Sequence, residues 1–399
     1  MKLLEYQSKN LLAEFGLDFT RPQVVADVAE IGRVIEDTGF PVVLKAQVPS
    51  GGRGRSGGVK KVARSGDVPD AVGALLAMEI QGHPVSGVAI EPWIDVGREL
   101  YAGITWDLAA AQPVALLSAG GGMEVEEDFA DQSARCLVDP VVGLRPYQGR
   151  ELAARIGLRG KILTGVGTVL EQLARAFVEL DALTLEINPL AVVGEERLIG
   201  LDARVEIDDD AVFRQRPRLC KLGEIASTAA GRPATPMEIE AERIDAMDHR
   251  GVAGRLVEFD GSLGLLIGGG GASLTVFDAV LRYGGRPANY CEMGGNPTAE
   301  KVAALTRLLL AKPGVEQLAV IMNVVNNTRA DIIAAGVVAG IEQAGLRAAE
   351  VVTVFRVPGS WEAEARQQMA AVGVAALGRE VSLDEAARLA VERTDSHAA

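Results

Sequence analysis

The sequence predicts a mixed α+β region over roughly the first 210 residues and an α/β region with a doubly wound parallel sheet from about residue 255. In the first region, short apolar runs follow one another closely, which is typical of hairpins. In the second, strand-type and helix-type segments alternate regularly, which favours a parallel sheet covered by helices. Residues 215–240 are polar, contain three prolines and lack clear periodicity as far as about residue 236, which predicts a linker.

The spacing of apolar residues places the individual elements. A helix is expected over 3–15, because Leu4, Leu11, Leu12 and Phe15 recur at helical spacing before Gly16. Further elements of the first region are expected as helices over 27–37, 149–157 and 161–180 and as strands over 41–46, 59–62, 88–94, 101–105, 113–117, 183–185 and 198–201. A helix near 237–247 precedes strands near 263–267, 286–291, 317–323 and 350–355 and helices near 272–283, 298–311, 329–344 and 361–371.

Composition limits the classes of function. The chain has 399 residues, of which 48% are hydrophobic but only 4% aromatic, so its cores are built from Ala, Val, Leu and Ile. The net charge of −14 argues against nucleic acid or an anionic membrane as a partner, while local cations still allow anionic substrates. Cys136, Cys220 and Cys291 show no C-x-x-C spacing, which favours a reducing, cytoplasmic setting. No apolar run reaches membrane-spanning length.

The first candidate site combines a strand lysine with a glycine-rich segment. Lys45 lies in an apolar strand, and residues 51–58 contain Gly52, Arg53 and Gly54 among further glycines. Glycines let backbone amides approach phosphate oxygens, and Lys45 and Arg53 supply positive charge. The pattern is neither a P-loop nor a dinucleotide-binding motif, because a strand rather than a helix follows the glycines. The alternative is a flexible hairpin turn.

Two groups of acidic and amide residues are further candidates. Glu91, at the end of an apolar strand, and Glu99 are interpreted as acceptors for an adenine amino group or a ribose hydroxyl, with solvated surface residues as the alternative. Glu186 and Asn188 are two apart on one strand and therefore face the same side. With Asp202 on the next apolar strand they form an oxygen-ligand set suited to Mg²⁺, unless they form a structural hydrogen-bond pair.

In the second region, Gly268–Gly271 connect a strand to a helix, which predicts either an anion site at the helix N-terminus or only a tight turn. Residues 292–297 and 323–329 end the next two strands, so all three segments should line one edge of the sheet. The chain has only three histidines, His83, His249 and His397, and none is followed by a glycine-rich capture loop. They are interpreted as structural or solvated.

These motifs, taken together, resemble those of succinyl-CoA synthetase β subunits, and the resemblance covers nearly the whole chain. The motifs keep the same order and spacing. They are Leu4-Glu5-Tyr6-Gln7 with Lys9, Phe15-Gly16-Leu17, Val43-Leu44-Lys45-Ala46-Gln47-Val48, Gly51-Gly52-Arg53-Gly54, Pro146-Tyr147-Gln148-Gly149-Arg150-Glu151, Glu186-Ile187-Asn188-Pro189-Leu190, Phe213-Arg214-Gln215, and Gly294-Gly295 with Glu300 and Val302.

The resemblance implies an ATP-grasp domain over 1–225, a linker with a connecting helix over 226–250 and a flavodoxin-like domain over 251–399. It also implies the roles of individual residues. Lys45, Gly52, Arg53, Gly54, Glu91, Ile94 and Glu99 would bind ATP or GTP, Asn188 and Asp202 would hold Mg²⁺, and Glu186 would neighbour the phosphohistidine. In this family the histidine and the CoA site belong to an α subunit, which pairs with the β subunit as αβ or α₂β₂.

The implied reaction is the reversible, ATP-driven formation of succinyl-CoA in the tricarboxylic acid cycle, with ADP and phosphate as the other products. The sequence departs from the family in three loops that the family uses for the acid and the phosphohistidine. Gly268 begins a run of four glycines where Asn-Gly-Ala-Gly is usual, Asn326, Asn327 and Thr328 replace Gly-Gly-Ile, and Asn296 follows only two glycines. Gly268, Asn326, Asn327 and Thr328 are therefore expected to contact the acid.

The changed loops leave the acid open. Succinate is one hypothesis, and a hydroxylated or bulkier acid such as malate or citrate is the other, because polar side chains could hydrogen-bond it. A non-catalytic regulatory subunit is a further alternative, although the set of Lys45, Glu186, Asn188 and Asp202 speaks against it. A stand-alone ATP-grasp ligase is disfavoured by the second domain with its glycine-rich loops.

Overall fold

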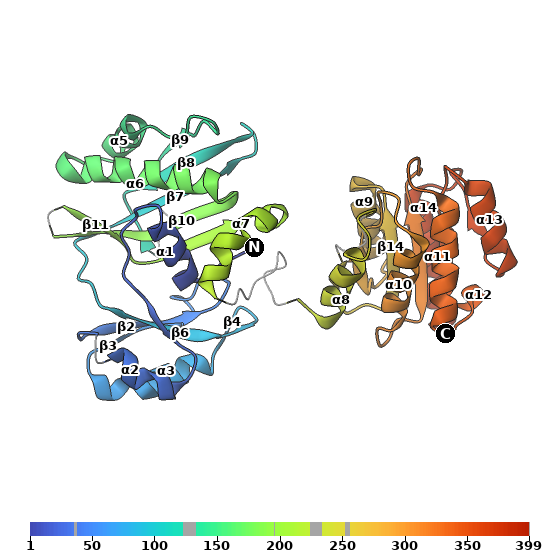
Figure 1. Ribbon diagram of the computed structural model, residues 1–399, viewed down its shortest axis with the longest axis horizontal. Helices are drawn as coiled ribbons and strands as arrows, with labels where there is room; N and C mark the ends of the chain where they lie inside the picture. The colour runs from blue at the N-terminus through green and yellow to red at the C-terminus, as the bar shows by residue number, and fades with distance from the viewer. Residues whose placement is uncertain (36–37, 123–132, 195, 224–233, 252–255, 399) are drawn as a thin grey trace. The chain divides into compact units, whose positions relative to one another are not determined.

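A computed structural model describes residues 1–35, 38–122, 133–194, 196–223, 234–251 and 256–398. The chain forms two compact units, unit 1 from Met1 to Pro233 and unit 2 from Ala234 to Ala399 (Figure 1). Among the residues described, no helix is both long and apolar enough to cross a membrane.

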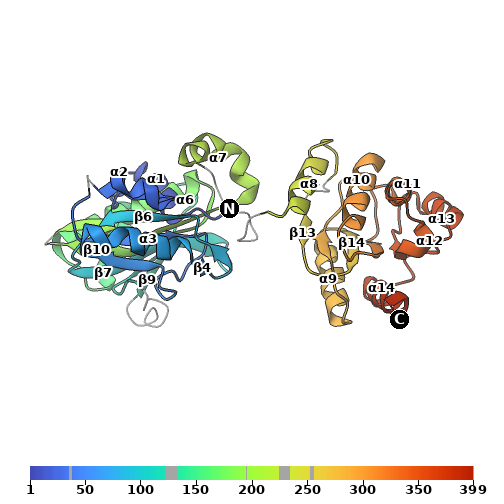
Figure 2. The same cartoon turned by 90° about the horizontal axis from the view of Figure 1, so that it is seen from below.

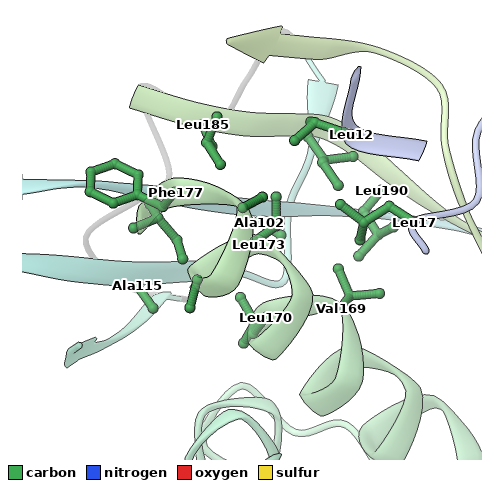
Figure 3. Close-up of a cluster of buried hydrophobic side chains, with 14 of the residues drawn as sticks. Leu12, Leu17, Ala102, Ala115, Val169, Leu170, Leu173, Phe177, Leu185 and Leu190 are labelled. Carbon is green, nitrogen blue, oxygen red and sulfur yellow. The ribbon is translucent and has the colours of Figure 1, made fainter. Parts of the chain in front are cut away.

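Unit 1 contains a large antiparallel sheet in the order β11-β10-β7-β8-β9, with β12 beside β10. Its strands are β7 (Arg98–Asp107), β8 (Gln112–Ser118), β9 (Ser133–Leu137), β10 (Ala182–Val193), β11 (Arg197–Gly200) and β12 (Ala203–Ile207). Helices α5 (Pro146–Arg155) and α6 (Gly160–Glu179) cover one face. Val169, Leu170, Leu173 and Phe177 of α6 point at the strands and form the core with them (Figure 3).

A smaller antiparallel sheet in unit 1 has the order β1-β6-β2-β3. Its strands are β1 (Gln23–Val25), β2 (Val42–Gln47), β3 (Val59–Val62) and β6 (Gly87–Pro92), and its helices are η1 (Val28–Glu30), α2 (Ile31–Ile35), η2 (Ser65–Asp67) and α3 (Val68–Leu76). A short hairpin, β4 (Glu79–Ile80) and β5 (His83–Pro84), follows α3. Val42, Leu44 and Ala46 of β2 pack in the core beneath these helices. Since strand side chains alternate, Lys45 and Gln47 project from the opposite face.

Helix α1 (Glu5–Ala13) lies against the large sheet, where the Leu3 amide donates to the Val205 carbonyl at 3.0 Å. Unit 1 also contains η4 (Asp209–Ala211), α7 (Val212–Leu219) and η5 (Cys220–Leu222). The predicted linker is therefore wrong where it begins, since residues 215–222 are helical. Gln215 and Leu219 are buried there, and Gln215 Nε2 donates to the Glu179 carbonyl at 2.9 Å, so contacts with α6 stabilise a helix despite Pro217.

Unit 2 is built on a parallel sheet in the order β14-β16-β17-β18. Its strands are β14 (Leu263–Gly268), β16 (Gln317–Met322), β17 (Val352–Arg356) and β18 (Ala376–Leu377). Helices α9 (Gly271–Arg282) and α14 (Leu383–Ala398) pack on one face, and α10 (Ala299–Leu310), α11 (Ala330–Gln343) and α13 (Glu362–Ala371) pack on the other (Figure 2). A short helix, α12 (Ala348–Val351), precedes β17.

Strand β15 (Asn289–Cys291) pairs with β13 (Leu256–Glu258) but also runs parallel to β14, as the bridges Leu263–Pro287 and Ile267–Glu292 show. The Asn289 side chain completes this pairing. Its Nδ2 donates to the Leu265 carbonyl at 2.8 Å, and its Oδ1 accepts from the Leu265 backbone amide at 2.9 Å. The spatial order β15-β14-β16-β17-β18 is the 2-1-3-4-5 order of flavodoxin-like folds. The predicted doubly wound sheet is confirmed.

The helix expected near 237–247 is present as α8 (Pro236–Asp245), but it belongs to unit 2 rather than to a connecting segment. Lys301 of α10 binds the C-terminal end of α8: Lys301 Nζ lies 3.2 Å from Asp245 Oδ1 and donates to the Asp248 carbonyl at 2.7 Å. The Lys301 side chain is 1% exposed. The sequence pattern gave no sign of β13, β18, α12 or α14, which are short or end the chain.

Candidate functional site

The glycine-rich segment after β2 folds back onto that strand. The Gly58 amide donates to the Arg53 carbonyl at 2.8 Å, and a Cβ atom on Gly58 would lie 2.7 Å from Ile80 Cδ1. Only glycine fits this approach without movement of Ile80. The fold of the loop buries the Arg53 side chain, while Gly52 and Gly54 on either side stay exposed.

The carboxylate of Glu5, on α1, is the point at which Lys45 and Arg53 meet. Glu5 Oε1 accepts from Lys45 Nζ at 2.8 Å, and Glu5 Oε2 accepts from Arg53 Nη1 at 2.5 Å. Lys9, one turn later on α1, forms an ion pair with the same Oε1 at 2.8 Å. The Glu5 side chain is only 1% exposed, so protein cations rather than water balance its charge.

Glu91 is the second carboxylate that contacts Lys9 and Lys45, so Glu5, Lys9, Lys45, Arg53 and Glu91 form one cluster of charged side chains. Lys9 Nζ donates to Glu91 Oε1 at 2.7 Å, and Lys45 Nζ lies 3.4 Å from Glu91 Oε2. The Thr20 hydroxyl donates to Glu91 Oε2 at 2.5 Å. The alternative of a solvated surface residue is therefore wrong for Glu91, whose side chain is 1% exposed and bonded through both oxygens.

Asp202 completes the cluster from the large sheet. Its Oδ2 lies 2.5 Å from Arg53 Nη2, and Lys45 Nζ also donates to the Leu201 carbonyl beside it. Asp202 was expected on a strand, but it lies in the two-residue link between β11 and β12. Because Asp202 lies outside both strands, its side chain does not have to follow the alternation of the sheet. The side chain is 34% exposed.

Glu186 and Asn188 lie on the same face of β10, and the prediction that they do so is confirmed. Asn188 Nδ2 donates to Glu186 Oε1 at 3.3 Å, and Asn188 Oδ1 accepts from the Gly122 amide at 2.6 Å. The backbone amide of Asn188 donates to the Asp202 carbonyl at 3.2 Å, so the two expected metal ligands sit opposite each other on adjacent segments.

Two further candidates border this region. Glu99, on β7, is exposed, and a Cβ atom on Gly122 would lie 2.7 Å from Glu99 Oε2, so Glu99 is close to the backbone that holds Asn188. Ile94 follows β6 and is half-buried. The structure thus brings Arg53 into direct contact with Asp202, links Lys45 to Arg53 through Glu5, and places Glu99 on the Asn188 side.

The charges of Glu5 and Lys45 are stabilised by their neighbours in the cluster. Burial alone would raise the pKa of Glu5, but Lys45, Lys9 and Arg53 outweigh it and hold the pKa of this carboxyl well below its usual range. Burial alone would lower the pKa of Lys45, but the carboxylates of Glu5, Glu91 and Asp202 outweigh it and raise the pKa. Both groups are therefore ionised at neutral pH, and Lys45 keeps its positive charge although it is buried.

The donor set next to the cluster fits a hard divalent cation. Asn188 and Asp202 offer an amide and a carboxylate oxygen, the ligand types that Mg²⁺ takes when substrate phosphates and waters complete its coordination. Among the described residues, no group of three or more His, Cys, Asp or Glu side chains is arranged to hold a metal ion. The expected pair of Asn188 and Asp202 does not count as such a group, because Asn188 contributes an amide oxygen.

The carboxyl edge of the unit 2 sheet carries the second group of candidates. A Cβ atom on Gly268 would lie 2.2 Å from the Met293 carbonyl oxygen, and one on Gly269 would lie 2.7 Å from Asn323 Cβ, so this turn packs tightly between the next two loops. The Gly270 amide, at the start of α9, donates to Glu292 Oε1 at 2.7 Å. A carboxylate of the protein itself thus occupies that donor of the predicted anion site.

The residues after β16 divide into two kinds. Thr328 is buried, and its hydroxyl accepts from the Asn296 amide at 3.1 Å, which ties the loops after β15 and β16 together. Asn326 and Asn327 are exposed. They lie at the switch point between β14 and β16, where the chain reverses its direction of growth across the sheet and where ligands of such folds bind.

Sequence reasoning missed Glu5, Lys9 and Thr20 as members of the unit 1 cluster. Glu5 and Lys9 belong to a motif that resembles the family, but nothing in that motif assigns them to the site. A physical signal was present, because the four-residue spacing of Glu5 and Lys9 puts them on one face of a helix. Their partners are distant in sequence, with Glu5 separated from Lys45 by 40 positions and Lys9 from Glu91 by 82. No local pattern predicts such contacts.

Known proteins resemble this chain in sequence and in fold. The ATP-grasp domain family matches residues 2–192. The β subunit of ADP-forming succinate–CoA ligase from Rubrobacter xylanophilus is 36% identical over 398 residues, which cover 98% of each chain. The β subunit of GDP-forming succinate–CoA ligase from Thermus thermophilus is 36% identical over 371 residues, which cover 92% of this chain and 93% of the relative.

Among solved structures, ATP citrate lyase from Methanothrix soehngenii has the same fold, with a TM-score of 0.79 over 98% of this chain and 99% of that chain at 22% identity. The sequence relatives match at more than 30% identity over almost their whole length. The chain therefore belongs to the succinate–CoA ligase β-subunit family, whose members are ligases that form carbon–sulfur bonds.

Proposed function

We propose that this chain is the nucleotide-binding subunit of an ADP-forming acyl-CoA ligase, and that it passes the γ-phosphoryl group of ATP to a histidine on an α subunit. The observation that supports this most strongly is the convergence of the buried Lys45 and Arg53 with the partly exposed Asp202 beside the glycine-rich loop. Two fixed cations and a carboxylate beside exposed glycine amides form a site for a magnesium nucleotide rather than for a neutral ligand.

Phosphoryl transfer needs positioning and charge stabilisation more than covalent chemistry from the protein. Lys45 and Arg53 would balance the charge of the phosphate oxygens, and their burial strengthens that interaction because little water screens it. Asn188 and Asp202 would hold Mg²⁺, which supplies further neutralisation of phosphate charge when bound. Asp202 is partly exposed and can be reached, although Arg53 must then give up part of its contact.

The phosphoryl acceptor would come from another chain. Among the residues whose side chains are described, neither histidine belongs to the Lys45 cluster: His83 lies in the hairpin strand β5, and His249 lies in unit 2 with a 92% exposed side chain. We therefore infer an α subunit that supplies the histidine, with Glu186 as its neighbour, and that binds most of the CoA. The relatives are themselves β subunits by name.

The carboxylic acid would bind at the carboxyl edge of unit 2, near Gly268, Asn326, Asn327 and Thr328. Succinate is the first candidate, because the relatives are succinate–CoA ligases. Malate or citrate is the second, because the exposed amides of Asn326 and Asn327 could hydrogen-bond a hydroxyl or a third carboxylate. Thr328 would support this loop, since its hydroxyl already binds the Asn296 amide.

A substrate panel tests both parts of the proposal. The chain purified alone should bind Mg-ATP or Mg-GTP in calorimetry but form no acyl-CoA with any acid. The chain co-expressed with its α subunit should form acyl-CoA, and the acid with the highest kcat/KM among succinate, malate and citrate identifies the substrate. Acyl-CoA formation by the isolated chain would show that it is a stand-alone ligase. A complex that binds nucleotide but activates none of the acids would favour a regulatory subunit.

A further inference from the structure

We propose that Glu5 is a positioning residue of the nucleotide site, because its one carboxylate holds the Lys45 ammonium and the Arg53 guanidinium side by side. The inference rests on the proposed nucleotide binding by these two cations and adds the part that keeps them in place. Helix α1 would thus help to build the nucleotide site, because Glu5 binds Lys45, 40 residues later in the chain, and Arg53, 48 residues later.

The two cations arrive from different elements and would repel each other without a shared partner. Lys45 projects from β2, whereas Arg53 comes from the loop after it. Each takes a separate oxygen of Glu5, at 2.8 Å for Lys45 Nζ and 2.5 Å for Arg53 Nη1. A single carboxylate can satisfy both only if both cations stand at fixed places around it, so Glu5 sets their spacing.

Glu5 itself is held firmly. It lies in the first turn of α1, and Lys9 on the next turn binds the same oxygen as Lys45. Lys9 in turn is anchored by both oxygens of Glu91 and by the Thr20 hydroxyl, the latter at 3.0 Å. The anchor is therefore built before any ligand arrives, as preorganised sites require.

The carboxylate of Glu5 differs from that of Asp202 in its availability. The Glu5 side chain is 1% exposed, against 34% for Asp202. A ligand that enters from solvent can compete for Asp202 but has little access to Glu5. We infer that Arg53 exchanges its Asp202 contact for phosphate on binding, while its Glu5 contact stays.

A double-mutant cycle in the full chain tests this role, with Mg-ATP affinity measured by calorimetry for Glu5→Gln, Lys45→Met and the double variant. Glu5→Gln keeps the size of the side chain but removes the charge that fixes the cations. It should weaken Mg-ATP binding by about tenfold or more, equivalent to 1.4 kcal/mol or more, because the two cations are no longer held together where the phosphates bind. In the Lys45→Met background the same change should cost clearly less, because one of its two targets is already gone.

Gln7→Leu is the matched control. Gln7 is a fully buried polar residue on the same helix, and its side chain binds backbone groups: Nε2 donates to the Leu222 carbonyl and Oε1 accepts from the Leu4 amide. It should leave Mg-ATP affinity within about twofold, which is about 0.4 kcal/mol. If Glu5→Gln does not fold, as judged by circular dichroism, Glu5→Asp replaces it in the cycle, since it keeps the charge but shortens the reach.

The outcomes separate this inference from the proposed function. Equal losses from the Glu5 change in both backgrounds, or an equal loss in Gln7→Leu, would overturn the positioning role and leave nucleotide binding by Lys45 intact. Unchanged Mg-ATP affinity in Lys45→Met would instead overturn the proposed nucleotide site, whatever the Glu5 variants do.

Discussion

At the scale of single residues, Asp202 has two candidate partners. In the structure its carboxylate lies 2.5 Å from Arg53 Nη2, and in the proposed function it would hold Mg²⁺ together with Asn188. The two roles compete for the same oxygen atoms. Binding of the magnesium nucleotide should therefore release Arg53 toward the phosphates, and the competition explains why a partly exposed carboxylate stands beside a buried guanidinium.

Asp202→Asn tests this assignment. The amide keeps the shape but loses the charge, so Mg²⁺ and Arg53 both lose an ionic partner, and Mg-ATP affinity should fall by about tenfold or more, equivalent to 1.4 kcal/mol or more. Calorimetry at several Mg²⁺ concentrations should show that the loss depends on the metal. Glu206→Gln on the adjacent strand β12, whose partner is Arg204 at the surface, is the control. Equal affinity in wild type and Asp202→Asn would remove Asp202 from the metal site.

The ion pairs of Glu5 predict a dependence of stability on pH. The folded-state pKa of Glu5 is held well below that of the unfolded chain, about 4.3, so its contribution is present above that value and is lost as the pH falls through the folded pKa. Glu5→Gln should lower the free energy of unfolding of unit 1 at pH 7 by about 3–5 kcal/mol, because it removes the buried carboxylate that Lys9, Lys45 and Arg53 share.

The difference between Glu5→Gln and wild type should shrink below about pH 4, where the unfolded-state carboxyl of wild type becomes protonated. Urea unfolding followed by tryptophan fluorescence measures it in a Trp361→Phe background, where the remaining tryptophans, Trp93 and Trp106, both belong to unit 1. A difference that stays constant from pH 7 to pH 3 would contradict the ion-pair account of Glu5.

The sequence identified part of this site by itself. A lysine within an apolar strand and an arginine among glycines both break the local pattern, and this break singled out Lys45 and Arg53. Glu91 was found too, but its burial was not predicted, because burial depends on α1 packing against β6 through Lys9. Glu5, Lys9 and Thr20 lie in ordinary surroundings, and only the tertiary fold brings them to the cations.

At the scale of elements, the Asn289 side chain links β15 to β14 between two backbone bridges, Leu263–Pro287 and Ile267–Glu292. Its side chain is fully buried and satisfies both the amide and the carbonyl of Leu265. Asn289→Leu would leave two backbone groups of β14 without partners in the interior, at a cost of about 1–3 kcal/mol each. The variant should lose stability in unit 2 and none in unit 1.

Hydrogen exchange measured by mass spectrometry localises that effect. Peptides that contain β14 (Leu263–Gly268) should exchange faster in Asn289→Leu, while peptides from β7 and β10 in unit 1 should be unchanged. Tyr290→Phe, which removes only a hydroxyl 2.7 Å from Ser273 Oγ, is the control and should change β14 little. Unaltered exchange of β14 in Asn289→Leu would show that the backbone hydrogen bonds to Leu263 and Ile267 hold the two segments together without the side chain.

Strong periodicity made most elements predictable. The four strands and four helices expected in unit 2 are present, because their apolar faces are long and regular. Helix α7 was missed, since it is only 8 residues long and contains Pro217, which disfavours a helix interior. Its contacts stabilise it instead: Arg214 pairs with Asp181 at 2.7 Å, and Gln215 binds the end of α6.

At the scale of the whole molecule, the chain combines two units with different kinds of candidate site. Unit 1 carries buried, mutually neutralised charges, and unit 2 carries exposed amides at the switch point of a parallel sheet. Such a division fits a reaction in two stages, in which a nucleotide is used at one site and an acid is activated at another. The family to which the chain belongs is clear, whereas its acid would, in the proposed function, depend on exposed loop residues at the edge of the sheet.

The loops at the carboxyl edge of unit 2 predict a change of substrate preference. Replacing Asn326 and Asn327 together by glycine removes two exposed amides without disturbing Thr328, which supports the loop from inside. If these amides bind a hydroxyl or a third carboxylate, the variant complex should lose about 1–3 kcal/mol of discrimination for malate or citrate over succinate, read from the ratio of kcat/KM values. An unchanged ratio would place the determinants of the acid elsewhere.

The most direct test of the central claim is the transfer of phosphate from ATP labelled at the γ position to the α subunit. The complex of this chain with its α subunit should show acid-labile, base-stable label on the α subunit, the behaviour of phosphohistidine, and the label should disappear with CoA and the acid. The complex carrying Lys45→Ala should remain assembled but form no label. Label on the α subunit at the wild-type rate in Lys45→Ala, or acyl-CoA formation by the isolated chain, would contradict the account.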